Sequence, residues 1–515
     1  MRISIVVVTV SGIYFLYDTL LKPPRNIRHI PQIDLIRFWS GLIRNQTLDV
    51  IANKYTIPAA SQSNAGIYTR FDFNGWTVRV NNPSLAKKIL LRPDIFPKTN
   101  QVNRLEGTII GRFLCPTQNI MFANGQQWKD QRKIANPAFS STMPIELFGR
   151  LSKKLFNVID RQLDEQPIDF YDLVKCWTLD SMGLAMFDFD FNSIDNQHSE
   201  WRKRYNTIVT EMTEPLPLIF PVLDKILPYR RRLNEELIQF LNMLQDIITQ
   251  KRDQLNNSSP SSSQRQEEQS TYKKRQTNNN ADLLTLMIEG ASAVNGNKMS
   301  DKDLLSNLCV FFLAGSDTTA HALSCIIYYL AVNQEIQQKA RQEVILILGD
   351  RPKDIVPSIG ELHHLTYINL IINEALRISP PLVTVVARYA SQDTELGGIF
   401  IPKGTCVTMD TYEMHKNPHI WRAPESFIPE RFVPGGEADQ LIKKQGFPWL
   451  AYGHGERGCI GMNFSLTEQR VLLSMLLRKY EWSLPEDSIH KEKLQTRGFI
   501  LSSPGSMFLN MIRRF

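Results

Sequence analysis

The spacing of hydrophobic positions changes along the chain, and each spacing predicts a different kind of element. Residues 65–81 (GIYTRFDFNGWTVRVNN) alternate between apolar and polar positions around a turn at Asn74-Gly75, which predicts a β-hairpin. From about residue 128 to residue 250 the apolar positions recur mostly at helical spacing. From about residue 335 to residue 515 helical stretches mix with short strand-like runs. We therefore expect an α+β fold that is mainly α-helical with small β-sheets.

One predicted helix is apolar on nearly all of its sides. Ser300 is suited to be its N-cap, with Asp303 at the third helical position. The helix continues through LLSNLCVFFLAGSDTTAHALSCIIYYLAVN to about Asn333. Because a helix with apolar residues all round has to be buried, we expect this one to cross the centre of the molecule.

Residues 256–280 (NNSSPSSSQRQEEQSTYKKRQTNNN) form a polar segment of low complexity between two helical regions. Such a composition cannot bury enough apolar surface to order itself. We expect a mobile surface loop here, within one domain.

The first residues predict a membrane anchor. Residues 3–17 carry no charge, and continuing across Asp18 to residue 21 gives a helix of about 28 Å, the thickness of a bilayer core. A signal peptide is the alternative, but no small-x-small cleavage pattern follows; a buried strand is the other. The sequence thus predicts an anchor at residues 1–21, a proline-containing hinge at 22–30 and a single catalytic domain at 31–515. Basic residues after the span place that domain on the cytosolic side.

Composition narrows the class of protein further. With 43% hydrophobic and 22% charged residues among 515, the chain is globular and wholesale disorder is excluded. The net charge of +7 is spread out, without a basic run interleaved with aromatic residues, so nucleic acid is not an expected partner. An anionic membrane surface or an acidic protein partner fits better. Six cysteines without a CxxC pair indicate a reducing compartment.

Of the six cysteines, only Cys459 lies in a sequence context that suggests a chemical role. It ends a glycine-rich loop, YGHGERGCIG (residues 452–461), and a helix follows directly. The glycines let the backbone approach something bulky and flat, and the start of the helix is expected to lower the pKa of the thiol. Arg457 adds a positive charge suited to a carboxylate.

The same loop also contains the spelling GxGxxG at residues 453–458, preceded by the possible strand FPWLAY. Alone, this segment would suggest a dinucleotide-binding unit. No alternation of strands and helices flanks it, however, and the Arg457-Gly458-Cys459 triplet has no role in binding a pyrophosphate.

Independent segments resolve the choice. The loop resembles the F-x-x-G-x-R-x-C-x-G heme signature of the cytochrome P-450 family, with Tyr452 in place of the usual Phe. Further segments resemble other motifs of that family and occur in the family's order. They are Trp128-Lys129-Asp130-Gln131-Arg132, Ala314-Gly315-Ser316-Asp317-Thr318-Thr319, Glu374-Ala375-Leu376-Arg377, Arg388 and Pro429-Glu430-Arg431-Phe432.

This resemblance covers essentially the whole chain and implies the cytochrome P-450 fold, with heme between the long central helix and the helix after Cys459. It implies that Cys459 is the axial ligand of the iron of heme b. Asp317 and Thr318 would be the catalytic residues, relaying protons for oxygen activation. The expected heme-binding residues are Trp128, Arg132, Arg388, Arg457 and Cys459, and the expected structural charge network is Glu374, Arg377 and Arg431. His415 is interpreted as a solvated or capping residue.

The implied activity is that of a monooxygenase in the endoplasmic reticulum membrane, monomeric, with electrons from a separate NADPH-dependent flavoprotein reductase. Two alternatives are a P-450-like isomerase or dehydratase that rearranges a peroxide, and a silent heme-binding sensor. Four largely apolar segments are expected to line the pocket and to favour a lipophilic substrate: Asn100–Met121, Glu211–Leu227, Phe311–Ala314 and Leu382–Ala387.

Overall fold

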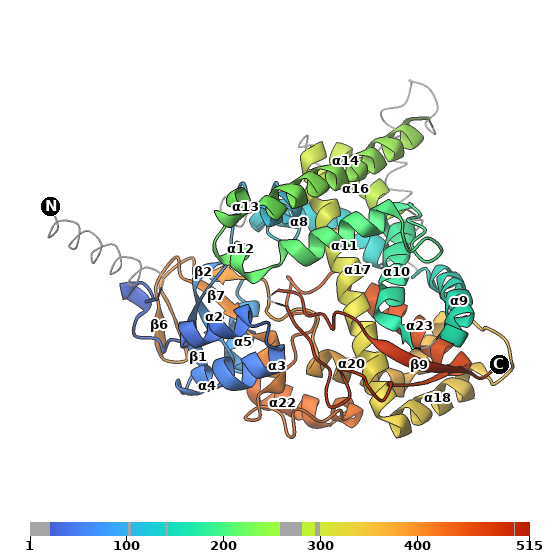
Figure 1. Cartoon of the computed structure of the whole chain (residues 1–515). Coiled ribbons are helices and arrows are strands. Elements are labelled where there is room, and N and C mark those ends of the chain that lie inside the picture. Colours follow the sequence, from blue (N-terminus) through green and yellow to red (C-terminus); the bar gives the residue numbers. More distant parts are fainter. Residues whose placement is uncertain are drawn as a thin grey trace.

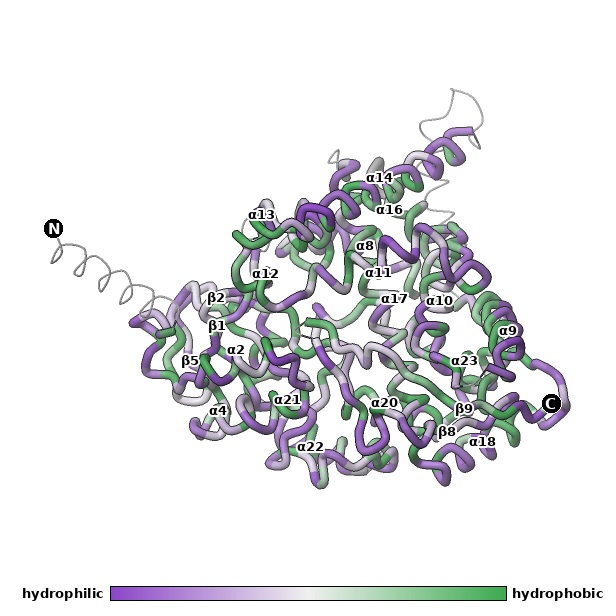
Figure 2. The backbone as a smooth tube through the Cα atoms, in the orientation of Figure 1, coloured by the Kyte–Doolittle hydropathy of each residue, from purple (hydrophilic) through white to green (hydrophobic). Residues whose placement is uncertain are grey.

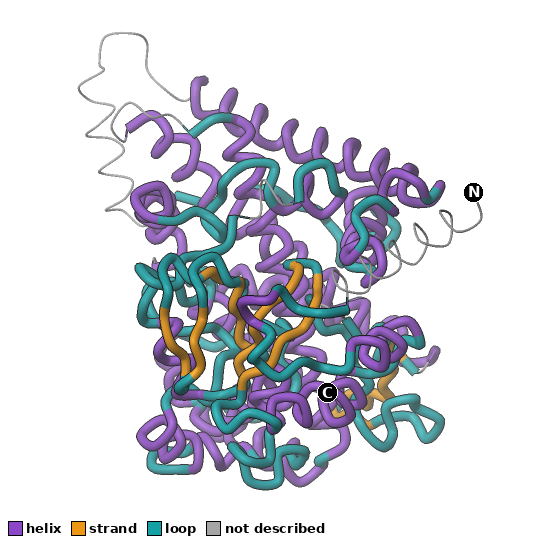
Figure 3. Tube along the Cα trace, turned by 90° about the vertical axis from the view of Figure 1, so that its left-hand side faces the viewer, coloured by secondary structure: helices purple, strands orange, loops and turns teal. Residues whose placement is uncertain are grey.

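The computed structural model describes residues 21–100, 105–140, 143–165, 167–257, 281–293, 299–498 and 500–515. Within these ranges a helical body adjoins a smaller part that carries most of the strands (Figure 1 and Figure 3). The expected anchor, and all of the expected mobile loop except residues 256 and 257, lie outside the described residues. Residues 22–30, the expected hinge, contain a short 3-10 helix, Arg25–Ile27, and bury Ile27 and Ile30.

The helices are distributed along the whole described part of the chain. In the first half they are α2 (Leu35–Ile43), α3 (Leu48–Ile51), α4 (Ile57–Ser61), α5 (Pro83–Leu90), α7 (Ile109–Leu114), α8 (Gly125–Ser140), α9 (Ile145–Gln162), α10 (Phe170–Met182), α11 (Glu200–Met212), α12 (Pro215–Ile219), α13 (Leu223–Ile226) and α14 (Pro228–Asn257). In the second half they are α16 (Leu283–Ala293), α17 (Asp301–Val332), α18 (Gln334–Leu348), α19 (Ile359–His364), α20 (Thr366–Ile378), α21 (Thr411–Lys416), α22 (Glu437–Gln445) and α23 (Met462–Lys479). The fold is thus mainly α-helical, as predicted.

The strands form three small sheets. The four-stranded sheet has the order β1 (Ile67–Asp72), β2 (Gly75–Val80), β7 (Cys406–Met409) and β4 (Arg388–Tyr389). The other two have the orders β3 (Ile168–Asp169), β9 (Phe508–Arg513), β8 (Tyr480–Ser483), and β5 (Thr394–Leu396), β6 (Ile399–Ile401).

The predicted hairpin is confirmed, because β1 and β2 pair antiparallel with Thr69 opposite Val78. The turn lies one residue earlier than predicted, on Phe73 and Asn74. On its other edge β2 pairs parallel with β7, so the far C-terminal half of the chain completes a sheet begun near its start.

Helix α17 runs through the middle of the molecule (Figure 1, yellow). Ser300 and Asp303 form a reciprocal capping box at its start, and Asn333 ends it, as the sequence predicts. Among the described residues it is the one helix long and apolar enough to cross a membrane, but most of its apolar stretch is buried by the protein itself. Its composition therefore reflects a central core position.

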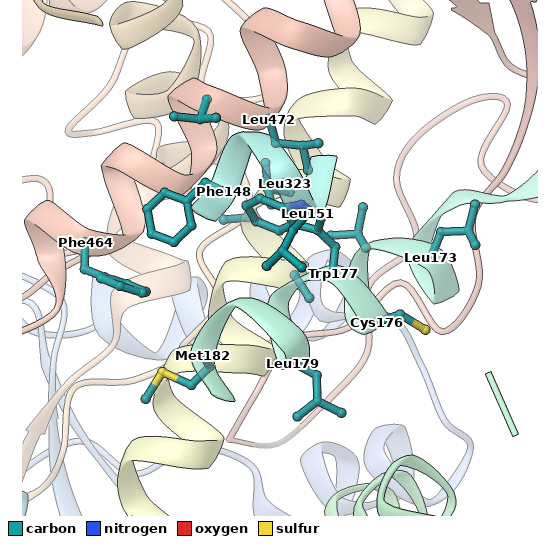
Figure 4. Packing of buried hydrophobic residues seen from close by; sticks show 14 of the residues in the cluster. Phe148, Leu151, Leu173, Cys176, Trp177, Leu179, Met182, Leu323, Phe464 and Leu472 are labelled. Atoms are coloured by element: carbon teal, nitrogen blue, oxygen red, sulfur yellow. The ribbon is translucent and has the colours of Figure 1, made fainter. Parts of the chain in front are cut away.

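Aromatic and aliphatic side chains fill the core between α17 and its neighbours. Phe148 of α9 lies 5.2 Å from Phe464 of α23 and 6.2 Å from Trp177 of α10, measured between ring centroids (Figure 4). Helix α9 packs its apolar side into this core and exposes Arg150 and Lys153 on its other side. Hydrophobic and hydrophilic residues alternate along the helix in Figure 2. This packing fixes α10, α17 and α23 relative to one another.

Candidate active site

The loop that carries Cys459 folds back on itself before α23 begins. The Cys459 amide donates to the Tyr452 carbonyl (2.9 Å) and the Gly458 amide donates to the Gly455 carbonyl (3.0 Å). Gly455 has a φ of +74°, and a Cβ there would lie 2.9 Å from the Leu90 carbonyl oxygen, so only glycine fits. Residues 447–452 form no strand, and the dinucleotide-binding alternative therefore lacks the strand it requires.

The loop and α17 enclose a cavity of about 250 Å³. Cys459 opens into it from the loop and Thr318 from α17. The rest of the lining is largely apolar, including Ile120, Val310, Phe311, Ala314, Leu382 and Val386.

The environment of Cys459 differs from the sequence-based expectation in one respect. The Cys459 side chain is accessible from the cavity, but the surrounding protein desolvates the thiol and raises its pKa, while the Gly461 amide and Arg132 lower it. The predicted lowering by the start of the helix is therefore present, but desolvation outweighs it. A thiol in these surroundings becomes a thiolate through coordination to a metal ion.

Four cations gather at one side of this cavity: Lys98, Arg132, Arg388 and Arg457. Lys98 and Arg388 pair in an isolated β-bridge. Arg388 donates to the Phe96 carbonyl (2.8 Å), Arg132 to the Gly458 carbonyl (3.2 Å) and Arg457 to the Met121 carbonyl (3.2 Å). Throughout the described part of the chain, none of the four forms an ion pair with an acidic side chain.

Burial makes this accumulation of positive charge unfavourable. It lowers the pKa of Arg388 to about 10, and burial with Arg388 lowers that of Arg457 to about 10. The pKa of Lys98 lies well below its usual value because of burial and the two neighbouring arginines. The buried Nε of Arg388 has no hydrogen-bond partner. These observations fit a ligand that brings two negative charges, as the propionates of heme do.

Trp128 lines the same cavity, and the Arg457 guanidinium lies 4.5 Å from its ring centroid. The structure therefore brings together all five expected heme-binding residues. It adds Lys98, which the sequence analysis missed because Pro97-Lys98-Thr99 matches no motif.

Tyr452, which departs from the usual phenylalanine, has polar partners. Its hydroxyl lies 3.4 Å from Ser465 Oγ and accepts from Gln469 Nε2 (3.2 Å). The extra hydroxyl is therefore accommodated inside the protein without an unpaired polar group.

On α17, Thr318 donates to the Ala314 carbonyl (2.6 Å) and faces the cavity. A Cβ at Gly315 would lie 2.5 Å from the sulfur of Met182, so this glycine lets α10 pack closely against α17. The helix thereby presents the Thr318 hydroxyl beside the space above Cys459.

Asp317 does not face this cavity. It accepts a hydrogen bond from the Tyr205 hydroxyl and lines a second cavity on the other side of α17. Burial raises the pKa of Asp317, while Lys175 and Tyr205 lower it. The expected catalytic pair is therefore divided between two sides of the helix.

The predicted charge network is assembled as a buried cluster. Arg377 Nε and Glu374 Oε2 lie 2.7 Å apart, and Arg431 Nε lies 3.1 Å from Glu374 Oε1. The Ile428 amide also donates to Glu374 (2.9 Å), and Arg377 donates to the His415 carbonyl (2.8 Å).

His415 corrects part of a prediction, because its side chain, in the last turn of α21, is fully buried and not solvated. As the capping alternative predicts, it contacts the Arg377 carbonyl in the last turn of α20. Its Nε2 accepts from the Leu450 amide (2.8 Å), so the neutral ring carries its proton on Nδ1 and donates to the Arg377 carbonyl (3.1 Å). Burial and Arg377 lower its pKa to about 3, which keeps the ring neutral. His415 thus joins the charge network to the start of the Cys459 loop.

The expected pocket segments are only partly confirmed. The segments supply Ile120, Met121, Phe311, Ala314, Leu382, Thr384, Val385 and Val386 to the cavity. No residue of Glu211–Leu227 lines it, and Thr213, Glu214 and Pro215 line the second cavity instead.

Comparisons with known proteins agree with this geometry. The family model for cytochrome P-450 matches residues 61–510 of this chain. Cytochrome P-450 4c21 of Blattella germanica is 29% identical and covers 79% of this chain and 78% of its own length. Cytochrome P-450 3A9 of Rattus norvegicus is 26% identical over 84% of this chain and 82% of its own.

Solved structures show the same fold. The heme domain of cytochrome P-450DA superposes with a TM-score of 0.74 at 20% identity, covering 94% of this chain and 98% of that domain. The chain belongs to the cytochrome P-450 family of heme-thiolate monooxygenases.

Proposed function

We propose that this protein inserts one oxygen atom from dioxygen into a lipophilic organic substrate, and that Cys459 would hold the iron of heme through its sulfur. The observation that carries the proposal is a single thiol that opens into a largely apolar cavity, beside four cations that form no ion pair among the described residues. Bound heme supplies the oxidising chemistry, and its thiolate ligand favours O–O cleavage. Two electrons would come from a separate NADPH-dependent flavoprotein reductase.

The residues around the cavity would hold that group from two sides. Cys459 would bind the iron, and Lys98, Arg132, Arg388 and Arg457 would pair with the carboxylates at one edge, with Trp128 beside them. The apolar wall of Val310, Phe311 and Leu382 would exclude water and bind the substrate by burying its apolar surface.

Asp317 and Thr318 lie on two sides of α17, and together they would deliver protons to the active site. Thr318 would hold a proton-donating water inside the active-site cavity. Asp317, at the second cavity, would connect that position with solvent. This arrangement favours a monooxygenase over a peroxide isomerase, which needs no proton supply.

Thr318→Ala is expected to keep heme and its CO spectrum while uncoupling turnover. NADPH consumption with reductase should persist, but hydrogen peroxide should replace most of the hydroxylated product, because the proton is no longer directed. Asp317→Asn should instead slow the whole cycle roughly 10-fold or more, as loss of a general acid does. NADPH, peroxide and product are measured together with a substrate identified by its spin-state shift. Unchanged coupling in Thr318→Ala would favour the isomerase alternative.

Arg388→Met is expected to speed heme loss without destabilising the heme-free protein. In the absence of heme, Arg388 is a buried cation without an acidic partner, so its removal relieves repulsion from Lys98 and Arg457. In the heme-bound Arg388→Met variant, the charge-assisted interaction between residue 388 and a heme carboxylate is lost. This loss corresponds to about 10-fold faster transfer of heme to apomyoglobin. Arg37→Met, at an exposed side chain on α2, serves as the control. If Arg388→Met transfers heme as slowly as the wild type, the assignment of Arg388 to the heme site is wrong.

For location, we propose the endoplasmic reticulum membrane, with residues 1–21 as anchor, 22–30 as hinge and 31–515 as the cytosolic catalytic domain. An exposed apolar patch supports membrane contact. It comprises Ile36 and Ile43 of α2, and Leu216, Val222 and Ile226 in or beside α12 and α13. The two groups are neighbours, because Trp39 of α2 packs 6.1 Å from Phe220.

Deletion of residues 1–21 is expected to release much of the protein from membranes while its heme content is preserved. Adding Leu216→Asp, Val222→Asp and Ile226→Asp should release most of the remainder, because these side chains then no longer enter the bilayer. Sedimentation with microsomes measures both. A deletion variant that stays wholly bound even with the three aspartates would contradict this account.

A further inference from the structure

The second cavity has a volume of about 430 Å³ and meets α17 at Asp317, on a different side of the helix from Thr318. Its walls come from α10, α11, the end of α2 and the C-terminal residues around 501–505. Pro381 lines both cavities, so the two spaces are neighbours.

Two cations at this cavity form no short ion pair, although Lys175 lies near enough to Asp317 to lower its pKa. Neither Lys175 nor Arg497 forms an ion pair within the part of the chain that the structure describes. Lys175 lies over the Tyr171 ring (5.6 Å to its centroid), and Arg497 donates only to the Asn45 carbonyl (3.2 Å).

The two acids in the wall already have partners. Asp317 accepts from the Tyr205 hydroxyl. Glu214 accepts from the Tyr229 hydroxyl (2.7 Å) and lies 4.0 Å from Arg230. The groups without partners are therefore positive.

A buried hydroxyl points to a missing hydrogen-bond partner. Ser502 lines the cavity, is 4% exposed, and its Oγ has no partner among the described residues. Its amide donates to the Pro381 carbonyl (2.8 Å), which fixes its position. Since buried polar groups are almost always hydrogen-bonded, a ligand or water is expected to form the hydrogen bond that the Oγ of Ser502 lacks.

The remaining wall is mixed, with Leu42, Ile51, Val209 and Leu501 supplying apolar surface. We propose that this cavity is a second small-molecule site for an amphipathic organic anion. Its carboxylate or similar head would pair with Lys175 and accept from Ser502, and its apolar body would lie along these four side chains.

The test is equilibrium dialysis of radiolabelled laurate against the full-length holoenzyme saturated with 4-phenylimidazole, which occupies the heme cavity. Laurate is expected to bind, and Lys175→Gln to weaken it about 10-fold. Lys175→Arg should restore binding, and dodecanol, which has no charge, should bind wild type and Lys175→Gln alike. Lys54→Gln is the matched control, because Lys54 lies 5.7 Å from the centroid of the Tyr55 ring on the surface.

Equal laurate affinity in wild type and Lys175→Gln would overturn the proposal. So would complete loss of laurate binding on addition of 4-phenylimidazole, which would place laurate in the heme cavity alone. Binding of the azole is read separately from its iron spectrum. A failure of the proposed heme site would therefore register there, while the dependence on Lys175 would still decide the second site.

Discussion

Glu374→Ala is expected to yield mostly heme-free or aggregated protein. The substitution leaves two buried guanidinium groups, Arg377 and Arg431, without the carboxylate that both now contact. Removing one partner of a buried ion pair costs about 3–5 kcal/mol. Because the whole stability of a domain is about 5–15 kcal/mol, this is a large part of it. The yield of soluble protein, its heme content and its thermal unfolding measure the effect.

The effect should reach the Cys459 loop because the network is connected to it. Arg377 bonds to His415, and His415 bonds to Leu450 at the beginning of the loop. Heme content is therefore expected to fall even in the fraction that remains soluble.

Glu430→Ala provides a matched control. Glu430 pairs with Lys339 (2.8 Å), but both side chains are about half exposed. Exposed pairs contribute about 0.2–1 kcal/mol, so this variant should fold and retain heme. A Glu374→Ala protein as stable and heme-loaded as Glu430→Ala, impaired only in turnover, would show that Glu374 acts in catalysis and not in folding.

The elements best predicted from the sequence are those with local signals. The capping box of Ser300 and Asp303 and the apolar run after it determine where α17 begins and that it is buried. Alternating residues around a tight turn likewise predict the β1–β2 hairpin. In both cases the information lies within neighbouring residues.

Which side of α17 faces the heme cavity could not be predicted in this way. Consecutive helical residues point about 100° apart, so Asp317 and Thr318 cannot face the same point. The side that meets the cavity depends on how α10 and α23 pack against the helix, and those contacts join distant parts of the chain.

Lys98 and His415 show the same limit. Lys98 reaches the cation cluster through its bridge to Arg388, 290 residues later by their numbers. His415 acts between Arg377 and Leu450, and nothing beside it in the sequence marks it as buried. The pKa of Cys459 shows the same limit, because the start of the helix that lowers it is visible in the sequence, whereas the surrounding protein that desolvates the thiol is not.

Cys459→Ser is expected to abolish thiolate ligation completely. Among the cavity-lining residues Cys459 is the only cysteine, and no histidine lines the cavity in the described part of the chain. A serine hydroxyl is a poor substitute for the thiolate that pushes electron density onto iron. The variant should fold, since Tyr452 bonds to the backbone amide of residue 459 and not to its side chain. Monooxygenase activity should be lost.

The most direct test is the absorption spectrum of the reduced, CO-bound protein. The wild type should show the strongly red-shifted Soret band of thiolate-ligated heme, and Cys459→Ser should lack it, with or without residual heme. Wild-type protein that binds heme without this band, or a Cys459→Ser variant that retains it, would contradict the assignment of Cys459 as the iron ligand.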